Sequence, residues 1–305
     1  MSDGFTIIPA IAITDDILVS SNVAENDYPV YSTATTYAVD AYVISTTTHH
    51  IYRSLQGANT NKPLPVLPAT ATDWWQDVGA TNRHKMFDRS VQSQTSNPNS
   101  IEIELAIEGR ATAVTILNAD GDELHIEMES PTAGVVYDQT FSLLDHAGIS
   151  DFYSWHFDDR DRIRDLAITG LPPYAGVTLR ISILRPGGTA LCGACLVGQA
   201  KEIGDTQFGA RIGMTDYSAK TPDAFGNLTV LERAYSQRGS FTVVVQNTFI
   251  DRLHKLLARY RATPVVYIGS PLYGCMVNYG FYKDYETEIQ YTTESLLSIN
   301  IESLT

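Results

Sequence analysis

A chain of 305 residues is longer than one hydrophobic core usually fills, so we expect two or three packing units. The formal net charge of −14 argues against a nucleic-acid partner, because an acidic surface repels phosphate groups. The three cysteines, Cys192, Cys195 and Cys275, lack the spacing of a disulfide framework, and we expect reduced thiols.

The N-terminal residues, MSDGFTIIPAIAITDD, have no basic region before the apolar stretch and carry acidic residues on both sides of it. This pattern is not that of a secretory signal, so we expect the chain to fold in a cytosol. No window approaches the roughly 20 apolar residues that cross a bilayer, and we expect no membrane insertion. Residues 5–20 are β-branched and apolar with a proline at position 9, which predicts an edge strand or an extended arm.

Residues 28–88 consist of short alternating runs separated by polar turns and one long proline-rich loop, GANTNKPLPVLPATATD. Strands of this length with such punctuation predict a small β module. We therefore assign residues 1–88 to an N-terminal arm and a small aromatic β module.

Residues 89–200 contain seven runs of the length typical of strands, from IEIELAI to ALCGACLVG. Asp120-Gly121 predicts a hairpin, and Pro186-Gly187-Gly188 predicts a further turn. We therefore expect residues 89–200 to form a β-sandwich of jelly-roll or immunoglobulin-like size.

Residues 201–305 carry the one convincing helix pattern. Apolar residues recur at steps of three and four between Thr248 and Arg261, Thr248 is a plausible N-cap, and Pro264 stops continuation. Strand-like runs flank the predicted helix on both sides, and residues 201–305 as a whole have almost no net charge. The predicted fold class is mainly β, and residues 201–305 are expected to form an α+β assembly domain with one amphipathic helix.

Trp74-Trp75 is the most informative local feature, because adjacent residues of a strand point to opposite faces and at most one indole can enter the core. The pattern around this pair resembles the small carbohydrate-binding modules of chitinases and related hydrolases. The matching residues are Tyr37, Val43, Tyr52, Asn59, Pro63, Trp74 and Trp75. The resemblance implies sugar binding through Tyr52, Asn59, Trp74 and Trp75, while packing of both indoles is the alternative.

A second resemblance begins in GATNRHKMFDRSVQSQT at residues 79–95, where TNR-x-x-MFD and a later QT follow WW-x-x-x-G. It continues through residues 208–238 and into the segment from VNYGFYKDYETEIQY to the end of the chain. These strings resemble proteins encoded in the tail-gene clusters of tailed bacteriophages. The resemblance implies a virion component of the tail tip or baseplate, present as a ring of copies.

Other constellations favour structure over chemistry. Asn82, Arg83 and Asp88 are expected to form a hydrogen-bonded corner between module and sandwich. The Cys192-Gly193-Ala194-Cys195 pair has no partner pair for a metal, and in an extended run its sulfurs would lie on opposite faces. The mixed-charge loop is expected to be a solvated turn or to form ion pairs between subunits rather than to bind calcium; it contains Asp158, Asp159, Arg160, Asp161, Arg162, Arg164 and Asp165.

No nucleophile elbow, phosphate-binding glycine loop or His-Glu-x-x-His motif occurs, and we predict a protein that is not an enzyme and needs no cofactor or metal. The leading hypothesis is a structural protein of a phage virion tail, assembled in the host cytoplasm, whose partners are its own copies, other tail proteins and possible host-surface glycans. The alternatives are a carbohydrate-binding adhesin without a virion role and a glycoside hydrolase whose two carboxylates the sequence does not reveal.

Overall fold

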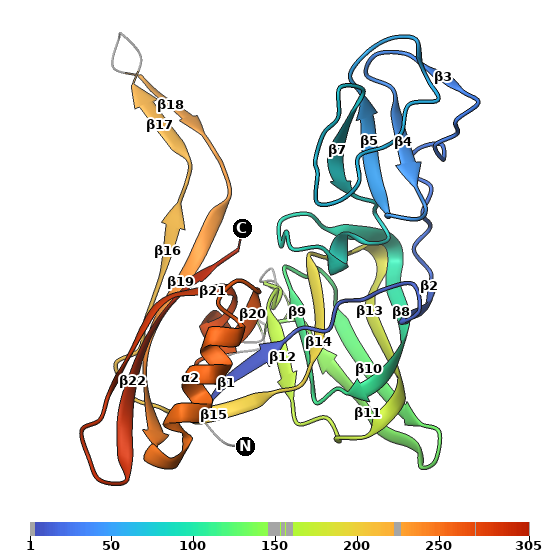
Figure 1. Ribbon diagram of the computed structural model, residues 1–305. Coiled ribbons are helices and arrows are strands. Elements are labelled where there is room, and N and C mark those ends of the chain that lie inside the picture. Colours follow the sequence, from blue (N-terminus) through green and yellow to red (C-terminus); the bar gives the residue numbers. More distant parts are fainter. Residues whose placement is uncertain are drawn as a thin grey trace.

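The computed structural model describes residues 4–145, 153, 156, 161–222, 227–271 and 273–304. The chain is mainly β, as predicted, and its antiparallel sheets form a small module, a sandwich and a barrel that carries the helix α2 (Figure 1). No helix in these ranges has both the length and the apolar character needed to span a bilayer.

The small module is held by short strands around one aromatic core. One sheet has the order β4-β5-β7, and a two-residue pairing joins β3 to β6. The buried residues of this core cluster are Val43, Tyr52 and Trp75. The strand bounds are β3 (Thr36–Tyr37), β4 (Tyr42–Ser45), β5 (His50–Ser54), β6 (Asn59–Thr60) and β7 (Trp75–Ala80).

The sandwich packs a five-stranded sheet, β11-β10-β13-β8-β2, on a three-stranded sheet, β12-β9-β14. Alternation of apolar and polar residues places one face of each long strand inside, as the pattern of β10 illustrates. The bounds are β2 (Leu18–Ser21), β8 (Thr95–Arg110), β9 (Ala113–Leu117), β10 (Glu123–Ser130), β11 (Gly134–Ser142), β12 (Leu166–Thr169), β13 (Ala175–Cys192) and β14 (Ala194–Gly198). A 3-10 turn, η1 (Lys85–Phe87), precedes this body.

Two predicted turns of the sandwich are wrong. Asp120-Gly121 is not a hairpin, because β9 pairs with β12 and β14 while β10 pairs with β11 and β13, so the chain crosses from one sheet to the other there. Pro186-Gly187-Gly188 does not end a strand. It forms a bulge inside β13, where the register with β8 shifts between Arg185 and Thr189.

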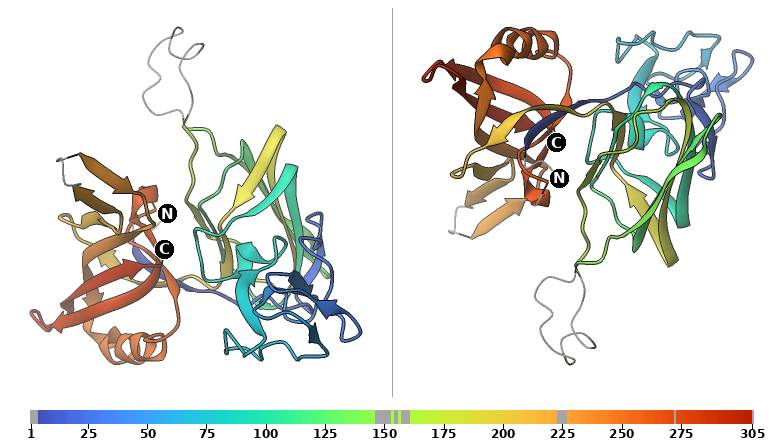
Figure 2. Two further views of the ribbon diagram at one scale, coloured as in Figure 1. Left: turned by 90° about the horizontal axis from the view of Figure 1, so that it is seen from above. Right: turned by 90° about the horizontal axis from the view of Figure 1, so that it is seen from below.

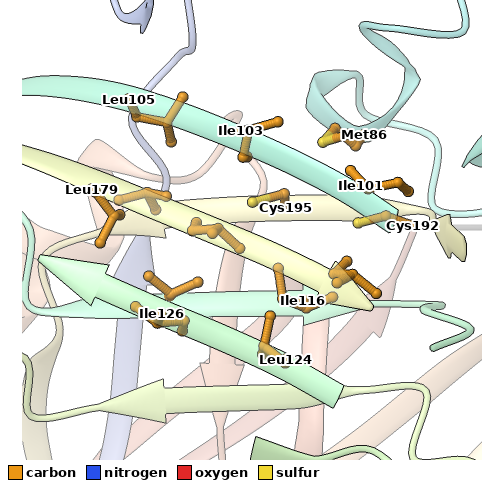
Figure 3. Packing of buried hydrophobic residues seen from close by; sticks show 14 of the residues in the cluster. Met86, Ile101, Ile103, Leu105, Ile116, Leu124, Ile126, Leu179, Cys192 and Cys195 are labelled. Atoms are coloured by element: carbon orange, nitrogen blue, oxygen red, sulfur yellow. The ribbon is translucent and has the colours of Figure 1, made fainter. Parts of the chain in front are cut away.

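The two thiols of the Cys192/Cys195 pair enter the same hydrophobic core, so the prediction of opposite faces is wrong (Figure 3). The chain changes sheet at Gly193, where a Cβ would overlap the carbonyl oxygen of Val91. Burial raises the pKa of the Cys195 thiol to about 12 and raises that of Cys192 as well. Both are free, as is the exposed Cys275.

The barrel is a sheet of order β15-β1-β20-β21-β22-β19-β16 that closes on itself through an additional pairing of β15 with β19. Gly204 lies at this seam, and a Cβ there would overlap the carbonyl oxygen of Val244. The bounds are β1 (Gly4–Pro9), β15 (Lys201–Thr206), β16 (Arg211–Asp216), β19 (Tyr235–Gln246), β20 (Val265–Ile268), β21 (Val277–Glu288) and β22 (Glu294–Ser303). A 3-10 turn, η3 (Gly274–Met276), precedes β21.

The first strand is not the predicted edge. β1 lies between β15 and β20, and Pro9 ends it, so the missing proline N–H falls at the end of the ladder. The chain then passes to the sandwich, where β2 pairs with β8. Residues 4–21 thus connect barrel and sandwich, while the boundaries at 88 and 200 stay predictions.

The predicted helix is confirmed as α2 (Ile250–Arg259), preceded by a 3-10 turn, η2 (Asn247–Phe249). Its Leu253 and Leu257 are buried in the barrel core. The predicted N-cap at Thr248 is wrong, because the helix begins after Phe249 without a side-chain cap bond.

Barrel and sandwich lie side by side and share a buried apolar layer (Figure 2). On the barrel side it includes Ile8, Val266 and Ile268, and on the sandwich side Leu117 and Leu196. Burial of such a layer favours one fixed arrangement of the two bodies, because separating them would expose this surface to water.

Candidate functional site

Three of the four predicted sugar-binding residues are buried. Tyr52, Asn59 and Trp75 each have no exposed surface. Trp75 packs edge-on against Tyr37 at a centroid distance of 5.2 Å, and its indole N–H donates to the carbonyl oxygen of Lys62 at 3.0 Å. The Asn59 side-chain amide donates to the hydroxyl of Ser54 at 2.9 Å. In this structure these residues hold the module together.

Trp74 is the partly exposed member of the set. The ammonium group of Lys62 lies 4.6 Å from the centre of its ring, which is a cation–π contact. Sugar binding by the module therefore stays a prediction that rests on Trp74, because only an accessible aromatic face can stack on a sugar ring.

The predicted corner between module and sandwich is confirmed for Asn82. Its side-chain amide donates to the carbonyl oxygen of Ser96 at 2.8 Å, and its side-chain oxygen accepts the Ser96 N–H at 2.9 Å. Asp88 instead accepts bonds from Ser90 and Ser93 in the following loop. The buried Nε of Arg83 has no hydrogen-bond partner in the described part of the chain.

A cluster of titratable groups beside this corner was not predicted. His49 and His84 stack with ring centres 3.8 Å apart, and Asp15 and Glu25 flank the pair. Burial, followed by the positive field of His49, lowers the pKa of His84 to about 4. The two histidines are 35 positions apart and Asp15 precedes both, so only the fold brings them together.

In the mixed-charge loop, Arg162 pairs with Asp120 and Asp122 of the same chain at 3.2 and 3.1 Å, while the predicted ion pairing between subunits stays a prediction. Asp158, Asp159 and Arg160 lie outside the described residues. Asp165 accepts the N–H of Asn118 at 2.9 Å beside a small cavity of about 110 Å³ between sandwich and barrel. Burial raises the pKa of its carboxyl group.

The most prominent surface feature is a two-stranded ribbon that projects from the barrel (Figure 1). Strands β16 and β19 leave the barrel together, and β17 (Ala219–Pro222) and β18 (Leu228–Leu231) continue the ribbon as a separate pair. We call residues 211–222 and 227–238 the assembly ribbon. None of the hydrophobic clusters of the described residues includes a residue of β17 or β18.

The assembly ribbon exposes large apolar side chains to solvent. Met214 is 66% exposed and Leu228 61%, although both occupy strands. The full set is Ile212, Met214, Tyr217, Leu228, Val230, Leu231 and Tyr235. Sequence reasoning missed the ribbon as a structural element, although the resemblance to tail proteins covered residues 208–238. The available signal was the short strand-like run LTVL at residues 228–231, which is rich in apolar and β-branched residues.

Comparison with known proteins adds no assignment. No protein-family model matches the sequence, and no curated protein matches it either. The two features that can carry a function are therefore the assembly ribbon and the histidine cluster at the junction between module and sandwich.

Proposed function

We propose that this protein is a non-enzymatic structural subunit of a bacteriophage tail tip or baseplate, which assembles with its own copies and other tail proteins. The observation that carries the proposal is the assembly ribbon. The resemblance of residues 79–95 and 208–238 to tail-cluster proteins supplies the biological setting.

An isolated two-stranded ribbon is marginally stable in water, since it lacks a third strand or a helix to cover one face. The assembly ribbon continues beyond the barrel, and its terminal strand β18 exposes Leu228, Val230 and Leu231. Contiguous exposed apolar surface marks interaction sites more often than free surface. A partner that covers this ribbon would remove the apolar surface from water and order the strands.

The body behind the ribbon suits a subunit that is fixed in an assembly. Barrel and sandwich share the apolar layer around Ile8 and Leu117, so a force on the ribbon reaches a rigid support. The ribbon's two outer strands contain one charged residue, Lys220, which is paired with Asp216. The core of a persistent interface is depleted in charge, and the two outer strands fit that description.

Mass photometry and light scattering of the full-length protein test the proposal. Val230 in β18 and Val135 in β11 are both 56% exposed, which makes them a matched pair. We expect Val230→Glu to weaken self-association or binding to a tail partner by about tenfold or more, because a half-buried valine contributes about 1.5 kcal/mol. Val135→Glu is expected to leave assembly unchanged.

Mass spectrometry of purified virions provides the second measurement, with several copies per particle expected. A protein that stays monomeric at high concentration and is missing from virions would contradict the proposal. If Val230→Glu and Val135→Glu changed assembly equally, the ribbon would not be the assembly surface.

A further inference from the structure

The histidine cluster at the base of the module joins three separate segments of the chain. Asp15 lies on the connection between β1 and β2, His49 in the turn between β4 and β5, and His84 after β7. One ligand atom of each residue lies within 4.8 Å of the others. Such a convergence of two imidazoles and a carboxylate is the donor set that zinc uses in proteins.

His49 is held in the orientation of a metal ligand. A carboxylate can only accept, so the N–H at Nδ1 donates to the two Glu25 oxygens at 2.9 and 3.1 Å. Glu25 is fixed in turn by the Thr81 hydroxyl, which donates to it at 2.9 Å. A carboxylate behind the ring in this way is the usual arrangement for a metal-binding histidine.

The other ring nitrogen of His49 is buried and has no hydrogen-bond partner among the described residues. Asp15 Oδ1 lies 2.7 Å from this Nε2, outside the direction that a hydrogen bond needs. A neutral ring with its proton on Nδ1 presents a lone pair at Nε2. A carboxylate at this distance from Nε2 favours positive charge there, which a metal ion ligated by both groups would supply.

We propose that Asp15, His49 and His84 bind one divalent transition-metal ion of the zinc class, with Glu25 as the positioning residue for His49. Three protein ligands leave one position of a tetrahedral site for water. The ion would link the β1–β2 connection, which carries Asp15, to the module, which carries His49 and His84. It would thereby fix the orientation of the module. This site is separate from the assembly ribbon and does not depend on it.

Metal binding requires a defined local change. In the stacked pair the ring planes differ by 22°, so the in-plane lone pairs of the two rings lie in nearly parallel planes. Tetrahedral ligation at about 2.0–2.1 Å sets ligand atoms roughly 3.3 Å apart. The His49 Nε2 and Asp15 Oδ1 atoms, now 2.7 Å apart, must therefore separate slightly, and the three ligand atoms, now within 4.8 Å of one another, must rearrange around the ion. The imidazoles must therefore turn out of the stack, and the bound state should differ from the metal-free state at these two rings and at the Asp15 carboxylate.

Titration of the tag-free, full-length protein with Zn²⁺ and Co²⁺ tests the site by calorimetry and visible absorption. We expect one ion per chain, and a Co²⁺ spectrum of four-coordinate type. Asp15→Asn should abolish stoichiometric binding, and it should fold normally because the Asp15 side chain is 67% exposed. Glu25→Gln should weaken binding about 10- to 100-fold.

His50→Gln is the matched control. His50 is the next residue in the chain and also contacts a carboxylate, that of Asp77 at 2.9 Å, but it is not part of the ligand set. Binding should be unchanged in this variant and lost in His84→Gln, with circular dichroism showing that each metal-free variant is folded. Absence of saturable binding by the wild-type protein, or full binding by Asp15→Asn, would overturn the proposal.

Discussion

The assignment of Trp75 to the module core and of Trp74 to its surface can be tested by truncating each indole. Trp75 is fully buried, contacts Tyr31 and Tyr37 edge-on at 5.7 and 5.2 Å, and donates its indole N–H to a backbone carbonyl. Trp74 is partly exposed and is covered on one face by Lys62. The two substitutions are therefore chemically identical but structurally different.

The expected costs follow from these contacts. Removing a buried tryptophan costs about 3–5 kcal/mol, and loss of the indole donor leaves the Lys62 carbonyl oxygen without that bond, so we expect about 4 kcal/mol for Trp75→Ala. Trp74→Ala loses a cation–π contact worth about 0.5–1 kcal/mol at an exposed site. The opening equilibrium of the module should rise about a thousandfold in the first variant and less than about tenfold in the second.

Hydrogen exchange read by mass spectrometry measures this directly. Amides of β4, β5 and β7 should lose protection in Trp75→Ala, while those of β8 and β13 in the sandwich should keep it, because the sandwich has a separate core. Trp75→Phe, which retains a buried ring, should fall between the two. If Trp74→Ala exchanged as fast as Trp75→Ala, the assignment of the two faces would be refuted.

Two further predictions concern the barrel and its contact with the sandwich. Asp165 has a raised pKa in the folded protein, so its contribution to stability is full below the ordinary value of 3.8 and is lost as pH rises through the raised value. Asp165→Asn should therefore raise the free energy of unfolding near pH 7 and not near pH 3, measured by denaturant titration; a gain of equal size at both pH values would contradict this. Gly204→Ala should destabilise the barrel by about 1–3 kcal/mol because its methyl group meets the Val244 carbonyl oxygen at the seam. Gly109→Ala, where nothing lies within 4 Å, is the control, and equal melting temperatures of the two variants would contradict the closed seam.

The candidate sites differ in how far the sequence reveals them. Strand alternation predicted that one indole of the Trp74-Trp75 pair points inward, and one does, although Trp74 lies in a bend just before β7 and not on the strand. Which indole is buried depends on the packing of Tyr31 and Tyr37, which the alternation does not specify. The histidine cluster has no local pattern, since its members come from three segments.

The sequence by itself determined where most strands of the sandwich and the last part of the barrel lie, and it located the helix. These features follow from periodicities of two and 3.6 residues, which the backbone imposes locally. Only the tertiary structure decided that β1 lies inside the barrel, that Asp120-Gly121 crosses between sheets and that the Cys192 and Cys195 thiols share one core. Those outcomes depend on hydrogen bonds and packing between segments far apart in the chain, as between β1 and β20, and a local pattern carries no information about its partner.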